Sequence, residues 1–111
     1  MNNEIIWTKD ASDDLYDIIP FIKQNSGLSI AKNIYSKFKT KVDNLIIFPE
    51  LGTVVPELKE IGIIYIKQMV ISPWKVYYKS DNNKIIILSI IDSRRNLEDI
   101  LIERLIKSKK I

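Results

Sequence analysis

Neither cysteine nor histidine occurs in this chain of 111 residues. The absence of cysteine excludes disulfide bonds, cysteine-based zinc sites and thiol nucleophiles. The absence of histidine removes the most common general base and the most common metal ligand. The composition therefore excludes Ser-His-Asp hydrolases and histidine-bound metal enzymes, and it implies no cofactor. Any catalysis would have to use Lys, Arg, Tyr, Asp or Glu.

Long hydrophobic runs are also lacking. No apolar run approaches the roughly 20 residues that a membrane-spanning helix requires. Residues 1–4 carry no basic region followed by an apolar stretch, as a secretory signal would. We therefore expect a cytoplasmic protein with no membrane partner, and the length suits one domain covering residues 1–111.

The charge balance is mildly basic, with 17 Lys and Arg against 14 Asp and Glu and a formal net charge of +3. Such a surplus is compatible with a polyanionic partner but does not demand one. The positions of the cations along the chain are therefore more informative than their number.

The first half of the chain has the pattern of a short strand followed by two amphipathic helices. Residues 5–7 are β-branched or aromatic, which favours a strand, and Thr8 can cap the helix that follows. A break at residues 25–27 precedes a second helix that Ser29 could cap and that ends near Pro49. The short break predicts an antiparallel helix hairpin. The apolar faces of the two helices are Ala11, Leu15, Ile18, Ile19 and Ile22, and Ala31, Ile34, Phe38, Val42 and Leu45.

The second half changes to the period of β-strands. Residues 51–58 read as a connector, and strands follow at 63–71, 74–79 and 85–91, separated by turns at 72–73 and 81–83. The third strand is apolar on both faces, which predicts an interior strand covered on both sides. Asn96 can cap a last helix whose apolar stripe is Leu97, Leu101 and Leu105. The order β-α-α-β-β-β-α predicts an α+β fold, with the helix hairpin on one face of a mainly antiparallel sheet.

Four different segments, taken in their order along the chain, have the residues of known sequence motifs. They are Trp7-Thr8 with Ala11, Asp14, Leu15 and Ile18; Phe48-Pro49 with Gly52 and Val55-Pro56-Glu57-Leu58; Trp74-Lys75-Val76-Tyr77-Tyr78; and Ile90-Ile91-Asp92-Ser93-Arg94-Arg95-Asn96-Leu97. Together they resemble the RelE/ParE toxins of type II toxin–antitoxin systems, which include plasmid stabilisation proteins. The resemblance covers nearly the whole chain and implies a toxin neutralised by a cognate antitoxin, a disordered segment of which folds across the toxin.

Two activities are known within the resembled family. ParE-like members bind and inhibit DNA gyrase without cleaving nucleic acid, whereas RelE-like members are ribosome-dependent mRNA endonucleases (mRNA interferases). Cleavage would require a general acid, a general base and cations that stabilise the phosphorane. This chain offers cations but no convincing acid–base pair, and its long helix hairpin resembles the ParE-like branch. We therefore favour growth inhibition by gyrase binding, with mRNA cleavage on the ribosome as the alternative.

Differences from the family pattern also favour gyrase binding over mRNA cleavage. Lys67 and Lys75 stand where the family usually has arginine, and Lys lacks the planar fork that grips a phosphate at two points. Gln68 stands where the family usually has glutamate, and Asp92 stands where it frequently has histidine. These replacements weaken the nuclease interpretation.

The candidate residues for binding nucleic acid or a protein target are cationic, with one aromatic. They are Lys67, Lys75, Tyr77, Lys79, Arg94 and Arg95. The cations could form a phosphate-binding patch, and Tyr77 between two lysines on one strand face could stack on bases. In a ribonuclease the catalytic set would be Lys67, Lys75, Arg94 and Arg95; no metal site is predicted. The alternative is a solvated polar face, on which Lys79 in particular would only discourage sheet aggregation.

Strand register decides whether these cations meet. A two-residue turn at Ser72-Pro73 would put Lys67 and Lys75 on opposite faces, and a three-residue connection could put them on the same face. Asp92 is a better acceptor for orienting Arg94 or Arg95 than a general base, because neighbouring cations lower its pKa. One of the two arginines could instead form an ion pair with the acidic first helix.

Overall fold

The protein is built around one five-stranded sheet with the strand order β1-β5-β4-β3-β2. The computed structural model describes residues 3–108, apart from the side chains of residues 97, 98 and 108. The strands are β1 (Glu4–Trp7), β2 (Thr53–Val54), β3 (Ile66–Ile71), β4 (Trp74–Asp81) and β5 (Lys84–Asp92). Only the β1–β5 pair is parallel, so the sheet is mainly antiparallel as predicted.

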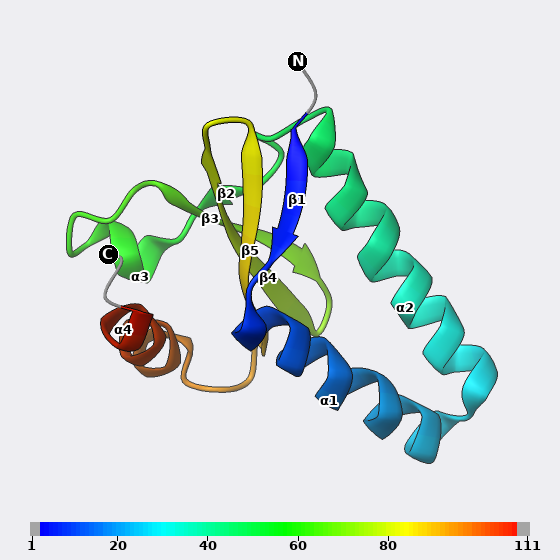
Figure 1. Ribbon diagram of the computed structural model, residues 1–111. Helices are drawn as coiled ribbons and strands as arrows, with labels where there is room; N and C mark the ends of the chain where they lie inside the picture. The colour runs from blue at the N-terminus through cyan, green and yellow to red at the C-terminus, as the bar shows by residue number, and fades with distance from the viewer. Residues whose placement is uncertain (1–2, 109–111) are drawn as a thin grey trace.

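Helices cover both faces of this sheet (Figure 1). The hairpin of α1 (Lys9–Ser26) and α2 (Leu28–Asp43) lies on one side, followed by a 3-10 turn at Asn44–Ile46. The helices α3 (Pro56–Lys59) and α4 (Leu97–Ser108) lie on the other side. The predicted α+β arrangement is confirmed. Within the described part of the chain, no helix is long and apolar enough to cross a membrane.

The start of α1 follows the sequence prediction closely. The hydroxyl of Thr8 accepts a hydrogen bond from the amide of Ala11 at 3.2 Å, which satisfies one free donor of the first turn. The same hydroxyl donates to the carbonyl of Ile87 at 2.8 Å, so the cap also ties α1 to β5. The helix continues through Pro20 to Ser26.

The start and end of α2 differ from the prediction. Gly27, with φ of 95°, reverses the chain in one residue, so α2 begins at Leu28 and Ser29 lies inside it without capping it. The helix ends at Asp43, several residues before the proline that was expected to stop it. The following 3-10 turn tightens the chain and buries Leu45.

The segment predicted as a plain connector contains two short elements. Its residues form β2, which pairs with β3, and α3. Pro56 stands at the first position of α3, where its fixed φ suits a helix and its missing N–H costs nothing. Val55 and Leu58 are fully buried, and their burial holds this small helix on the sheet.

The strands β4 and β5 form a hairpin with one irregularity. Asn82 and Asn83 both have positive φ, as a two-residue hairpin turn requires. Tyr77 pairs with Ser89 while Tyr78 pairs with Ile87, so Leu88 is an extra residue and forms a bulge in β5. The strand β5 is an interior strand covered on both faces, as its apolar sequence predicted.

Two hydrophobic clusters lie on opposite faces of the sheet. The cluster under the helix hairpin contains Phe38, Val76 and Tyr78. The cluster under α3 and α4 contains Tyr77, Ile91 and Leu101, with Leu105 packed against it. The predicted stripe of α4 is therefore confirmed at residues 101 and 105, whereas the side chain of residue 97 lies outside the described residues.

Candidate target-binding site

The two lysines that stand in family arginine positions lie on opposite faces of the sheet. Ile71 pairs directly with Trp74, so the β3–β4 turn has two residues. Lys67 faces the helix-hairpin side and forms an ion pair with Glu50, with 2.9 Å between Nζ and Oε2. Lys75 pairs with Val70 and faces the α4 side. Of the two registers considered, the structure has the one with a two-residue turn, so Lys67 and Lys75 do not share a site.

Tyr77 was predicted as a stacking platform for bases, and this prediction is wrong. It shares a strand face with Lys75 and Lys79 as expected, but that face is covered by α3 and α4. Tyr77 is 0% exposed and packs in the same cluster as Leu58 and Leu101. Burial and the nearby carboxylate of Glu57 raise the pKa of its hydroxyl. Tyr77 can therefore neither stack on a base nor exchange a proton with a substrate.

Tyr78 has a structural role on the opposite face. Its hydroxyl accepts from the amide of Gly52 at 2.8 Å and donates to the carbonyl of Pro49 at 2.9 Å. Burial raises the pKa of this hydroxyl as well. The Phe-Pro…Gly motif is explained by this contact, because it anchors the chain that leads into β2.

The two arginines after β5 lie in a loop that is fixed to the β3–β4 turn. The amide of Ser93 donates to the carbonyl of Pro73 at 2.8 Å, and the amide of Arg95 donates to the carbonyl of Asp92 at 3.0 Å. Asp92 Oδ1 accepts from both the backbone N and the Nε of Arg94, each at 2.9 Å. These bonds lower the pKa of Asp92 to about 2. The prediction that Asp92 orients an arginine is confirmed, and a carboxylate held in this way is a poor general base.

Arg94 and Arg95 line a pocket of about 600 Å³ between the loop and one side of α1. Its apolar lining includes Phe21, which is 66% exposed, and the half-buried Trp74 at the start of β4. Arg95 forms no ion pair with any residue in the described range, so its guanidinium is available to a partner. We call this the Arg-lined pocket. Its lining also contains the carboxylates of Asp14, Asp17 and Asp92, so the pocket presents both charges, and its arginines can contact an anionic or aromatic group of a binding partner.

Lys79 lies elsewhere. It lines a separate pocket of about 370 Å³ with Tyr65, Ile86 and Leu105 on the α4 side of the sheet. The structure therefore divides the predicted cations into four positions, and Arg94 and Arg95 share one pocket. Among the residues whose side chains the structure describes, no three or more Asp or Glu are grouped in a way that could hold a metal ion.

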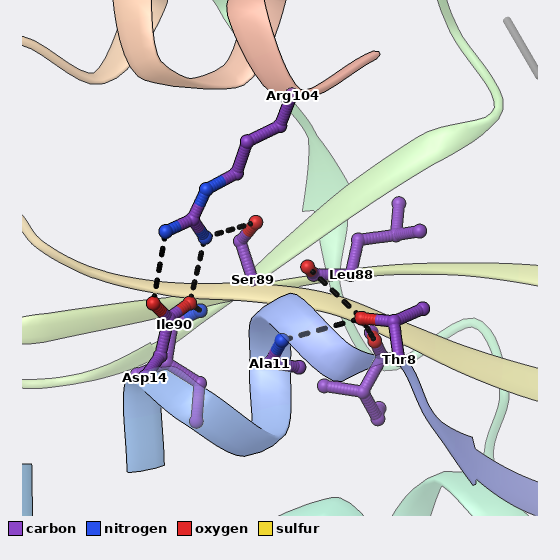
Figure 2. Close-up of polar contacts among 8 residues, drawn as sticks. Thr8, Ala11, Asp14, Leu88, Ser89, Ile90 and Arg104 are labelled. Atoms are coloured by element: carbon purple, nitrogen blue, oxygen red, sulfur yellow. Dashed lines mark hydrogen bonds and ion pairs between the residues drawn. The ribbon is translucent and has the colours of Figure 1, made fainter. Parts of the chain in front are cut away.

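Sequence reasoning missed the ion pair that joins α4 to α1. Figure 2 shows Arg104 reaching past Ser89 to Asp14, with 2.7 Å and 2.9 Å between its two terminal nitrogens and the carboxylate oxygens. Arg104 also donates to Ser89 Oγ at 2.8 Å, and Asp14 accepts the amide of Ile90 at 2.8 Å. Because β1 ends at Trp7, Asp14 supplies the acceptor that a neighbouring strand would otherwise provide.

The expected ion pair between α1 and Arg94 or Arg95 is thus formed by Arg104 instead. A signal for it existed in the sequence. Asp14 lies three residues after Ala11 and four before Ile18, so it belongs to the buried face of α1. Arg104 lies next to the apolar stripe of α4. A carboxylate and a guanidinium at such inward positions require partners.

Comparison with known proteins identifies similar chains. Residues 5–97 match the family described as "ParE toxin of type II toxin-antitoxin system, parDE". Toxin ParE3 of Caulobacter vibrioides is 28% identical over 93 residues, which cover 84% of this chain and 89% of the relative. The solved structure titled "Chromosomal ParDE TA system from P. aeruginosa" is similar with a TM-score of 0.66 at 18% identity, covering 81% of this chain and 95% of the other. At this identity, the structural likeness supports the fold.

Proposed function

This chain belongs to the ParE toxin family of type II toxin–antitoxin systems, and on that premise we propose that it inhibits growth by binding DNA gyrase without cleaving nucleic acid. We also propose that a cognate antitoxin neutralises it, and that both events take place in the cytoplasm. The family match gives the class of toxin. The geometry of the site supports inhibition by binding a target more than inhibition by cleaving RNA.

This proposal rests mainly on one observation: the side chains near the cations that could transfer protons are either buried or held in an ion pair. Both tyrosines next to the predicted cations are fully buried, with raised pKa values. Asp92 stays charged because Arg94 binds it. Cleavage of RNA through its 2′-hydroxyl needs an acid and a base within reach of the phosphate. Since these groups offer neither, inhibition by binding is the function that the geometry favours.

Part of the lining of the Arg-lined pocket resembles a protein-binding hot spot, and Asp14, Asp17 and Asp92 line the pocket as well. Arginine and aromatic residues are enriched in such centres, and here two guanidinium groups lie beside an exposed phenylalanine. Asp92 holds Arg94 in place before any partner arrives, which lowers the entropy cost of binding. We propose that this pocket contacts gyrase, and that Lys67, Lys75 and Lys79 contribute long-range attraction only.

Substitution of the arginines tests the pocket. We expect Arg95→Ala to weaken inhibition of gyrase at least about fivefold, because truncating a hot-spot residue costs more than about 1 kcal/mol. Arg94→Ala should act in the same direction. The matched control is Lys37→Ala, which removes an exposed cation from α2 outside this pocket. Inhibitory concentrations from a supercoiling assay and growth of expressing cells are the measurements. Full toxicity of both arginine variants would rule out this pocket as the target site.

A further inference from the structure

The charged side chains of the Arg-lined pocket come from two walls. One wall is a side of α1, where Asp14, Asp17 and Phe21 follow one another at steps of three and four residues. The other wall is the end of β5 and the loop after it, with Arg94 and Arg95. The remaining lining is mostly apolar, and its apolar members are Ile18, Ile22, Trp74 and Ile90.

Most of the charges on these walls are already paired within the protein. Asp14 is bound by Arg104, which lies outside the pocket lining, at 2.7 Å and 2.9 Å (Figure 2). Asp92 is bound by Arg94, with 2.9 Å between Oδ1 and Nε. A carboxylate held by a guanidinium offers little net charge to a partner.

Two charges of opposite sign remain available on the pocket. Asp17 on the α1 wall and Arg95 on the loop wall are both exposed. Neither forms an ion pair with any residue whose side chain the structure describes. The pocket therefore presents one available carboxylate on one wall and one available guanidinium on the other.

This arrangement distinguishes the two kinds of surface that gyrase bound to DNA offers. A DNA backbone carries a negative charge at every phosphate, so the surfaces that bind it are lined with cations. Asp17 would repel such a backbone on the α1 wall. A protein segment can carry both signs of charge, and the charge patterns of bound protein surfaces are complementary. The charges of the pocket therefore match protein better than DNA.

We propose that the Arg-lined pocket binds a protein segment of gyrase and not the DNA that gyrase holds. A carboxylate of this segment pairs with Arg95, a lysine or arginine of it pairs with Asp17, and an apolar side chain packs against Phe21 and Trp74. This inference rests on the proposed inhibition of gyrase, and it adds Asp17 as a residue that determines which partner the pocket accepts.

Reversal of the charge at Asp17 tests the inference, because the two partners predict effects of opposite sign. Against a protein segment, Asp17→Lys brings two cations together, and we expect the half-inhibitory concentration in a supercoiling assay to rise at least about tenfold. Against DNA, the same change adds a phosphate contact, so inhibition would become stronger and more dependent on salt. Asp17→Asn, which removes only the charge, should weaken inhibition less than Asp17→Lys.

The matched control is Asp13→Lys, the same change of charge on α1 at an exposed residue outside the pocket. We expect it to inhibit supercoiling nearly as well as the wild-type chain. An equal loss in Asp13→Lys and Asp17→Lys would show a general effect of charge and would overturn the inference.

The remaining outcomes separate this inference from the proposed function. If the wild-type chain blocks supercoiling and Asp17→Lys blocks it as well or better, the inference is wrong and gyrase inhibition stands. If the wild-type chain leaves supercoiling unaffected, the proposed function is contradicted. Thermal unfolding checks that each variant folds. Should Asp17→Lys not fold, Asp17→Asn decides, and inhibition by it at the wild-type level or above overturns the inference.

Discussion

Two arginine–aspartate pairs in this protein have different roles because their burial differs. The Arg104–Asp14 side chains are 27% and 13% exposed, and the pair bridges α4, β5 and α1. The Arg94–Asp92 side chains are 78% and 23% exposed, and the two residues are only two positions apart, at the end of β5 and in the loop after it. A shielded pair that crosses elements stabilises the fold, whereas an exposed local pair mainly orients a side chain.

Replacement of Asp14 should therefore be costly. Asp14→Ala leaves the guanidinium of Arg104 without its carboxylate and the amide of Ile90 without its acceptor, so we expect a loss of about 2–4 kcal/mol in the free energy of unfolding. Asp13→Ala, one residue earlier, removes only an exposed pair with Lys9 and should leave the midpoint of urea unfolding nearly unchanged. Equal effects of the two substitutions would show that the bridge is not structural.

The Arg94–Asp92 pair predicts a specific response to pH. The pKa of Asp92 is lowered from 3.8 to about 2 in the folded protein, mainly by hydrogen bonds from Arg94. A lowered pKa means that the pair contributes stability above about pH 4 and loses it as the pH falls toward 2. Carbon NMR of the Asp92 carboxyl should show a midpoint near 2, which Arg94→Gln returns toward 3.8. An unshifted midpoint in the wild-type protein would contradict the preorganisation of Arg94.

At the scale of elements, the segment before β2 depends on one close approach. A Cβ on Gly52 would lie 2.7 Å from the carbonyl oxygen of Gln68 and from the ring of Tyr78. The segment must pass this near because the Gly52 amide donates to the Tyr78 hydroxyl. No side chain other than hydrogen fits between this segment and the sheet.

Gly52→Ala should accordingly destabilise the protein by about 1–3 kcal/mol, the usual cost of overpacking. Thermal unfolding followed by circular dichroism measures the change. Gly62→Ala is an informative comparison, because a Cβ at Gly62 would meet no atom within 4 Å and only its φ of 85° opposes the substitution. A Gly52→Ala protein as stable as the wild type would mean that β2 and its connection can move away from Tyr78.

The elements with a long periodic pattern were predictable from the sequence, and the short ones were not. Apolar residues at steps of three and four identified α1 and α2, and the polar turn at Asn82-Asn83 located the β4–β5 hairpin. The elements β2 and α3 span only two and four residues, too few for a period to show. Their structure comes from pairing with β3 and from the burial of Val55 and Leu58.

The candidate site was harder to predict than the fold, because it depends on long-range register. The local prediction held: Asp92 binds Arg94, two residues away. Whether Lys67 faces Lys75 depends on the length of one turn, and whether Tyr77 is exposed depends on where α3 and α4 dock. Neither follows from the residues nearby. The Arg-lined pocket combines α1 with the ends of β4 and β5, segments far apart in the chain.

At the scale of the whole molecule, the Arg-lined pocket that we propose for gyrase lies on one side of α1. Arg95→Ala should reduce toxicity without lowering the stability of the protein, because Arg95 is exposed and lines the pocket.

The most direct test of the central claim is a supercoiling assay with the purified wild-type chain, gyrase, ATP and relaxed plasmid, run beside an assay of mRNA cleavage on programmed ribosomes. We predict that the chain blocks supercoiling, that Arg95→Ala does so only at higher concentration, and that the ribosome-bound mRNA stays intact. Unimpaired supercoiling together with cleavage of the ribosome-bound mRNA would contradict the account.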